Sequence, residues 1–182
     1  MKKSFAHRII LRKYRLSDAA GIFSWRNDKE TTKYMGKKFR NITTLKKTRD
    51  SLHKVMRSKS NDSAYYVIAD KKTDAYIGGI DLTSIDRIDK VGILSIVIGN
   101  NEDRNKGIGT EAITLLLRKA FKDLKLHKIE LNVDEENMAA IKCYQKCGFL
   151  IEGELRGHSI VDGKYHNLIT MGILAADYSR GE

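Results

Sequence analysis

A short basic segment with two glycines constrains this chain more than any other feature. The segment Arg104-Asn105-Lys106-Gly107-Ile108-Gly109-Thr110 follows an apolar run at residues 93–98 and precedes a helix-patterned run at residues 111–123. Glycine lets the backbone approach a ligand without a Cβ clash, and the unpaired N–H groups of a first helical turn attract anions. The order of strand, loop and helix therefore predicts an anion site, to which Arg104 and Lys106 add positive charge.

A second motif gives this loop a more specific meaning. The loop lacks the third glycine of the dinucleotide fingerprint, and no Gly-Lys-Ser/Thr follows it as in a Walker loop. Further along stands Asn137-Met138-Ala139-Ala140-Ile141-Lys142-Cys143-Tyr144-Gln145-Lys146-Cys147-Gly148-Phe149. Together the two motifs resemble the acetyl-CoA site of the GNAT superfamily of N-acetyltransferases. That family reads R/Q-x-x-G-x-G/A in the loop and N-x-x-A-x-x-x-Y-x-x-x-G-F in the second motif, and every specified position is present.

Apolar periodicity predicts alternating strands and helices along the whole chain. Aspartate, serine and threonine at positions 17–18 and 43–44 are expected to cap the first two helices, the second with Leu45, Leu52, Val55 and Met56 on its apolar face. Gly148 is expected to end the last helix, and Asp162-Gly163 to turn a final hairpin. The expected strands are residues 7–13, 65–70, 76–85, 90–98, 128–133, 149–160 and 165–174, and the later helices are residues 107–123 and 137–146.

The pattern indicates an α/β (α+β) domain with a mixed sheet, and the chain length suits a single domain over residues 1–182. The resemblance implies more: a GNAT-like, mostly antiparallel seven-stranded sheet flanked by about four helices and splayed between strands 4 and 5, with acetyl-CoA in the opening. Within the superfamily the chain resembles the branch of ribosomal-protein-alanine, spermidine and amino-sugar acetyltransferases. The segments Trp25-Arg26-Asn27-Asp28, Gly153-Glu154 and Tyr165-His166-Asn167 carry that similarity.

The resemblance also implies roles for individual residues. Tyr144 lies two helical turns after Asn137, so both project from one helix face. Tyr144 is expected to protonate the departing thiolate as general acid, and Asn137 to contact the pantetheine or cap its helix. The oxyanion is expected to meet a backbone N–H near Ile96, Val97 and Ile98. The full set of expected cofactor contacts is Ile96, Val97, Ile98, Arg104, Asn105, Lys106, Gly107, Ile108, Gly109, Thr110, Asn132, Asn137 and Tyr144.

The base that accepts the amine proton stays open. Many relatives place a glutamate on the fourth strand, but residues 91–98 contain no carboxylate. Asp81 and Glu102 are candidates, and a water chain that carries the proton to solvent is an alternative.

Composition excludes several other kinds of protein. No apolar run is long enough for a membrane span, and the N-terminus lacks the apolar core of a signal peptide, so a cytoplasmic location is expected. The two cysteines, Cys143 and Cys147, lie on one predicted helix, where a disulfide would be strained. The five histidines show no metal-binding spacing, and no metal is expected. His158 and His166 flank the hairpin turn, where they either line the acceptor site or lie on the surface.

Charge is distributed unevenly. Residues 1–60 hold 18 Lys/Arg and 4 Asp/Glu, whereas residues 61–182 hold 16 and 19. The segment Gly36-Lys37-Lys38-Phe39-Arg40 stands where spermidine enzymes of this branch carry acidic residues. These observations favour a neutral or anionic amine acceptor, such as an amino sugar or a protein N-terminus, over a polyamine. Spermidine acetylation is the alternative.

The basic charge also suggests partners of another kind. The lysine-rich run at residues 45–59 could contact RNA, DNA or the ribosome without catalysis, but it lacks interleaved aromatics, which disfavours direct nucleic-acid binding. Acetyl-CoA, a small-molecule or peptide amine and, at most, a second copy of the chain in a homodimer are the expected partners.

Overall fold

The computed structural model describes residues 8–36, 39 and 41–181. His7, Lys37, Lys38 and Arg40 therefore lie outside the described residues, and so does the part of the acceptor argument that rests on them. No helix in the described part of the chain is long and apolar enough to cross a membrane.

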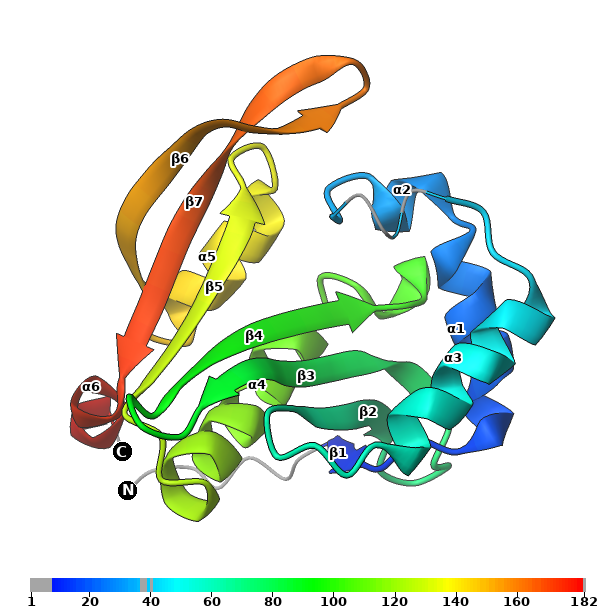
Figure 1. The fold of residues 1–182 in the computed structure, drawn as a ribbon, viewed down its shortest axis with the longest axis horizontal. Coiled ribbons are helices and arrows are strands. Elements are labelled where there is room, and N and C mark those ends of the chain that lie inside the picture. Colours follow the sequence, from blue (N-terminus) through cyan, green and yellow to red (C-terminus); the bar gives the residue numbers. More distant parts are fainter. Residues whose placement is uncertain (1–7, 37–38, 40, 182) are drawn as a thin grey trace.

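Seven strands form one sheet in the order β1-β2-β3-β4-β5-β7-β6 (Figure 1). Only β4 and β5 run parallel, and the other neighbours are antiparallel, which confirms the predicted mostly antiparallel mixed sheet. The strands are β1 (Ile9–Arg12), β2 (Ala64–Asp70), β3 (Tyr76–Asp86), β4 (Val91–Ile98), β5 (Lys128–Asp134), β6 (Leu150–Val161) and β7 (Lys164–Leu174).

The sheet opens between β4 and β5, as predicted. These strands pair only between Val91, Gly92 and Ile93 on β4 and residues 128–130 on β5. Beyond Ile93 they diverge into the wedge that Figure 1 shows, while β4 continues to pair with β3 as far as Ile98. In the wedge, the edge of β4 that faces β5 has no strand partner among the described residues.

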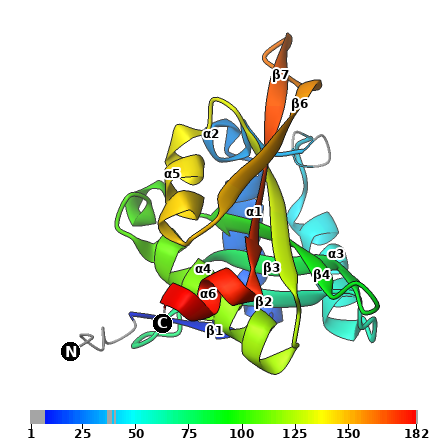
Figure 2. The same cartoon turned by 90° about the vertical axis from the view of Figure 1, so that its left-hand side faces the viewer.

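Helices cover both faces of the sheet (Figures 1 and 2). α4 and α5 pack on one face, where they enclose the main apolar core, and α1 and α3 pack together on the other. The short helices α2 and α6 were not predicted. The helices are α1 (Ala19–Arg26), α2 (Lys29–Thr32), α3 (Leu45–Arg57), α4 (Ile108–Arg118), α5 (Met138–Lys146) and α6 (Ala175–Gly181).

The core uses the predicted apolar stripes. Ile113, Leu116 and Leu117 of α4 are almost fully buried, and the stripe continues through a π-helical turn, Lys119–Asp123, that ends the predicted helix. Ile129, Leu131 and Val133 of β5 are buried on the face toward these helices, as their alternation predicts. The prediction that Met56 is buried is wrong: Met56 is 46% exposed, since it lies in the last turn of α3, and the buried residues of this helix, Thr48 and Leu52, lie in its earlier turns.

Two of the three predicted caps are present. The Thr44 hydroxyl accepts from the Lys47 N–H at the start of α3, and the Asn137 side chain accepts from the Ala140 N–H at the start of α5. Asp18 does stand at the start of α1, but its carboxylate does not cap the helix. It accepts from both terminal nitrogens of Arg12, at 2.9 and 2.7 Å, because a buried carboxylate gains more from a bidentate guanidinium.

The predicted final hairpin is confirmed. Asp162 and Gly163 both have positive φ, 49° and 80°, as a two-residue turn of the type I′ class requires. β6 and β7 extend past the end of β5 and place the hairpin at the open end of the wedge (Figure 1).

Candidate active site

The predicted anion loop forms an uncapped helix start. Gly107 is the residue before α4 and has φ +80°, which glycine adopts without strain. Unlike α3 and α5, α4 has no side-chain cap among the described residues. The N–H groups of its first turn are therefore left to an external acceptor such as a pyrophosphate.

Residues at the start of the first strand contact the loop and the first turn of α4. The Arg8 guanidinium donates to the Lys106 carbonyl at 3.0 Å, and the Glu111 carboxylate accepts from the backbone N–H groups of Arg8 and Ile9. These hydrogen bonds tie the loop and the first turn of α4 to the start of the sheet.

The Arg104 guanidinium donates to the Ile98 carbonyl at 3.2 Å and to the Thr31 hydroxyl at 2.6 Å. These two acceptors hold it between the end of β4 and α2. Lys106 remains exposed, and Asn105 takes positive φ.

The second motif places Tyr144 and Asn137 on α5. Tyr144 is 9% exposed, and its ring packs 5.9 Å from that of Phe149, centre to centre. Burial raises the pKa of the Tyr144 phenol, which keeps it protonated at neutral pH. Among the described residues its hydroxyl has no hydrogen-bond partner, so the proton is available to a ligand.

The remaining predicted contacts lie on β4, β5 and α4. Ile96, Val97 and Ile98 are half-buried on the part of β4 that has left β5. Asn132 lies on the β5 face opposite the core, and its side-chain oxygen accepts from the Thr170 hydroxyl. Ile108, Gly109 and Thr110 form the first turn of α4, where Thr110 contacts Cys143 of α5 rather than open solvent.

The two candidate bases lie in different settings. Asp81 stands opposite Ser95 in the register of β3 and β4, on the face that carries Tyr14, and its carboxylate accepts from the Tyr66 N–H. Glu102 is exposed in a 3-10 turn, Asn101–Asp103, after β4. Neither position identifies a base by itself.

A group of carboxylates that sequence reasoning missed surrounds the end of β5. His166 Nδ1 lies 3.0 and 3.1 Å from the two oxygens of Asp134, and both side chains are buried. Hydrogen bonding to Asp134 raises the pKa of His166, with further help from Glu136 and Glu135. His158 is exposed, so of the two hairpin histidines only His166 belongs to the interior.

Asn167 connects two more carboxylates, those of Glu135 and Glu154, to this group. Its backbone N–H and side-chain amide donate to Glu135, at 2.8 and 3.1 Å, and the same amide donates to Glu154 of β6. We call Asp134, Glu135, Glu136 and Glu154 the acidic cluster. The sequence signal was present, since Asp134-Glu135-Glu136 stands at the end of β5, but only the fold brings Glu154 to it.

The end of β5, where the acidic cluster begins, lies across the open end of the wedge from α2 (Figure 1). The pKa of Lys33, the residue after α2, is raised, first by a hydrogen bond with Tyr34 and further by the charges of Asp162 and Glu136. The end of α2 and the hairpin are thus within electrostatic reach of one another.

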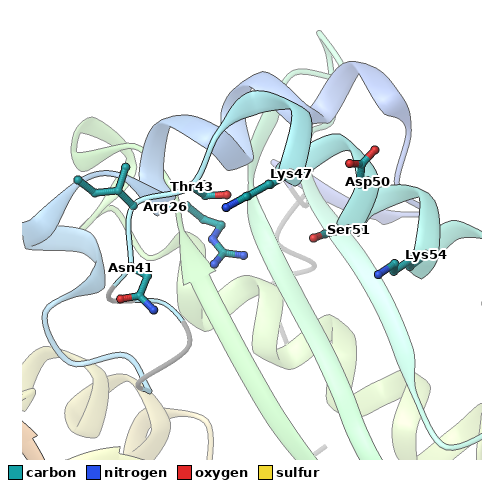
Figure 3. A pocket seen from close by; sticks show the side chains of 8 residues that line it. Arg26, Asn41, Thr43, Lys47, Asp50, Ser51 and Lys54 are labelled. Atoms are coloured by element: carbon teal, nitrogen blue, oxygen red, sulfur yellow. The ribbon is translucent and has the colours of Figure 1, made fainter.

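A basic pocket is lined by residues of α1, of the segment 41–43 and of α3 (Figure 3). Its volume is about 430 Å³, and Arg26, Lys47 and Lys54 outnumber its one acid, Asp50. The complete lining is Arg26, Asn41, Ile42, Thr43, Lys47, Asp50, Ser51 and Lys54. No cluster of three or more metal-ligating side chains occurs in the described part of the chain.

Comparison with known proteins agrees with this geometry. Residues 8–150 match the model of the acetyltransferase (GNAT) domain. The chain is similar to an uncharacterised N-acetyltransferase, p20, of Bacillus licheniformis, at 28% identity over 98% of this chain and 99% of that one. It is also similar to a spermidine N(1)-acetyltransferase of Vibrio cholerae, at 32% identity over 71% of this chain and 75% of the relative.

A solved structure extends the likeness to the whole fold. The crystal structure of spermidine N-acetyltransferase from Vibrio cholerae in complex with CoA and spermine matches with a TM-score of 0.84 and 27% identity, covering 94% of this chain and 98% of that one. With the split sheet, the uncapped glycine loop and the second motif in place, the chain belongs to the GNAT family as an acetyl-CoA-dependent N-acetyltransferase.

Proposed function

We propose that the acceptor is a polyamine of the spermidine type, and that the acidic cluster holds its positive charge. The observation that carries this proposal is the gathering of Asp134, Glu135, Glu136 and Glu154 beside the wedge. The likeness to spermidine acetyltransferases supports it. A polyamine carries several ammonium groups, so local carboxylates offset the repulsion from the basic N-terminal third.

The cluster suits a cation because part of its charge is uncommitted. Asp134 is committed to His166, and Glu135 is held by Asn167. Glu136 is exposed, and its oxygen lies 3.9 Å from His166 Nε2, beyond a good hydrogen bond. Glu154 is exposed and accepts from the Asn167 amide through Oε1 alone, so we expect Glu136 and the second oxygen of Glu154 to face the distal ammonium of the acceptor.

On the other side of the wedge, the proposed roles follow the cofactor motifs. Acetyl-CoA supplies an acetyl group already activated as a thioester. The first turn of α4 after Gly107 binds the pyrophosphate through backbone N–H groups, and Asn137 is assigned to the start of α5. Tyr144 donates its proton to the leaving sulfur, a role that its buried ring and the raised pKa of its phenol support.

An acetyl-transfer assay across acceptor classes tests the proposal. Spermidine should give a higher kcat/KM than an amino-sugar phosphate or an unacetylated peptide. Glu136→Gln and Glu154→Gln should each raise KM for spermidine roughly 2–5-fold, the range for partly exposed ion pairs. Asp89→Asn, an exposed carboxylate in the turn between β3 and β4, is the matched charge control and should leave KM unchanged. Unaltered spermidine kinetics in both cluster variants would remove the basis of the proposal.

The basic pocket favours a second candidate, an amine that carries an anionic group. Arg26, Lys47 and Lys54 converge there with the hydroxyls of Thr43 and Ser51 (Figure 3). In that case the amino-sugar phosphate would be the better substrate in the same assay. Lys47→Gln and Lys54→Gln would then raise its KM, while the two glutamate variants would not.

A further inference from the structure

The two cysteines lie directly against the start of α4. Cys143 Sγ is 3.4 Å from the Thr110 hydroxyl, and the Cys147 thiol donates to the Thr110 carbonyl at 3.7 Å. A Cβ added at Gly109 would lie 3.4 Å from Cys143 Sγ. The sulfur atoms therefore fill the contact between α5 and the helical turn that carries the cofactor motif.

Both thiols are free and half-buried, and they differ in character. Hydrogen bonds from Cys147 and Thr110 lower the pKa of Cys143 to about 6, and the charge of Lys146 acts in the same direction. The positive end of α4 favours an anion in this place as well. Contact with the sulfur of Cys143 and burial both raise the pKa of Cys147. The Cys147 proton is directed to the Thr110 carbonyl, whereas Cys143 Sγ lies against the Thr110 hydroxyl at the start of α4, so Cys143 is the nucleophile of the pair.

We propose that Cys143 is a thiol-modification site through which low-molecular-weight disulfides weaken acetyl-CoA binding. The Cys143 thiolate attacks one sulfur of the disulfide R–S–S–R, a bond forms between Cys143 and that sulfur, and the other half leaves as RS⁻ and takes a proton from water. The protein sulfur is oxidised and the departing half is reduced, so that electrons balance. A reducing thiol reverses the step.

The geometry favours a lasting mixed disulfide over closure onto Cys147. Residues four apart on a helix have Cβ atoms about 5–6 Å apart, whereas a disulfide needs about 3.5–4.5 Å. An intrahelical bond would require α5 to unwind at its last turn. The adduct therefore stays on Cys143, where its bulk lies between α4 and α5.

The consequence for acetyl-CoA follows from packing. Cys143 Sγ already lies 3.4 Å from the Thr110 hydroxyl, and a single methyl group at Gly109 would fill the remaining space to van der Waals contact, so this contact has no room for the several atoms of an adduct. An adduct on Cys143 must displace the first turn of α4, whose N–H groups are the proposed pyrophosphate site. Overfilling a packed contact commonly changes an equilibrium on the order of 10-fold or more, and we expect a loss of acetyl-CoA affinity of that size.

The test uses the whole protein and glutathione disulfide as the probe. Acetyl-CoA affinity is measured by calorimetry for the reduced protein, after treatment, and after reduction again, with the modified residue located by peptide mass spectrometry. One adduct on Cys143, a reversible affinity loss of about 10-fold, and protection of Cys143 by prebound acetyl-CoA are expected. Cys143→Ser should bind acetyl-CoA, and glutathione disulfide should not change its affinity. Cys147→Ser should still form the adduct on Cys143, but more slowly.

Several outcomes would overturn the proposal. They are an adduct on Cys143 with unchanged affinity, a Cys143–Cys147 disulfide as the main product, or no reaction at Cys143 in the native protein. The inference rests on the proposed pyrophosphate site, and the reduced protein separates the two failures. Failure of the untreated, reduced protein to bind acetyl-CoA would overturn both the proposed pyrophosphate site and the proposed effect of Cys143 modification. Normal binding by the reduced protein that the adduct does not alter would overturn only the effect of Cys143 modification.

Discussion

The two sides of the wedge between β4 and β5 are built in different ways. On the cofactor side, Gly107 and Tyr144 each belong to a short continuous motif, and the backbone and core hold them in place. On the proposed acceptor side, charges come from segments far apart in the chain: Glu135 joins Asn167 across 32 positions, and the basic pocket joins α1 to α3. The residues proposed to bind the cofactor thus lie close together in the sequence, whereas those proposed to select the acceptor come together only in the folded protein.

This difference changes how the net charge is to be interpreted. The excess of Lys/Arg in residues 1–60 argued against a polyamine, yet four carboxylates lie together at the end of β5. Because ionic screening limits charge effects to about 8–10 Å, the charges nearest the acceptor outweigh a distant surplus. Predictions on the cofactor side should therefore show large effects from single atoms, and those on the acceptor side smaller and salt-dependent effects.

The largest expected effect is that of Tyr144→Phe. The ring stays packed on Phe149, and only the proton donor is lost. Turnover should fall by about 10²–10⁴-fold with little change in acetyl-CoA affinity. Single-turnover kinetics with saturating acceptor check this, and calorimetry with acetyl-CoA is the control. Wild-type turnover in this variant would make Tyr144 a packing residue and remove the main chemical role from the cofactor side.

A glycine pair tests the backbone part of the cofactor side. Gly107→Val forces a β-branched residue to φ +80° and should weaken acetyl-CoA binding on the order of 10–100-fold. Gly109→Ala is the matched control, because its added Cβ meets Cys143 Sγ at an ordinary contact distance of 3.4 Å. We expect less than about a 2-fold change there, within the range of neutral substitutions. Equal losses in both variants would show that packing, and not the loop conformation, determines affinity.

Salt separates the acidic cluster from the basic pocket. For wild-type enzyme and spermidine, kcat/KM should fall several-fold as ionic strength rises, because screening weakens the attraction of the cluster. The double variant Glu136→Gln/Glu154→Gln should lose most of this dependence. Steady-state assays at matched acetyl-CoA saturation measure it. A rate for spermidine that rises with salt would mean that repulsion from Arg26, Lys47 and Lys54 dominates the approach.

The same division explains what the sequence could predict. The start of α4, the capped α5 and the hairpin turn follow from periodicity and from residues close together in the chain, whereas the split of the sheet was implied by the resemblance to the GNAT superfamily. Arg104 was expected beside the phosphates, but its partners Ile98 and Thr31 become neighbours only in the folded protein. His166 could not be told from a surface residue for the same reason, since its burial depends on Asp134 from another strand.

The smallest expected effect is a pH-dependent one at His166. Asp134 raises the pKa of His166 above its value in the unfolded chain. The protonated pair therefore stabilises the folded state fully below the unfolded pKa of about 6.5, and this contribution is lost as pH rises through the higher folded pKa. His166→Asn should lower the melting temperature most at mildly acidic pH, and the difference from wild type should shrink toward about pH 9. Thermal melts across this range measure it, with His158→Asn, exposed on β6, as the control that should show no such trend. If the difference in melting temperature between wild type and His166→Asn instead grows with pH, His166 is neutral in the folded protein. The negative charges of Asp134 and Glu136 would then not be offset by a protonated His166, and more of that charge would be available to a cationic acceptor.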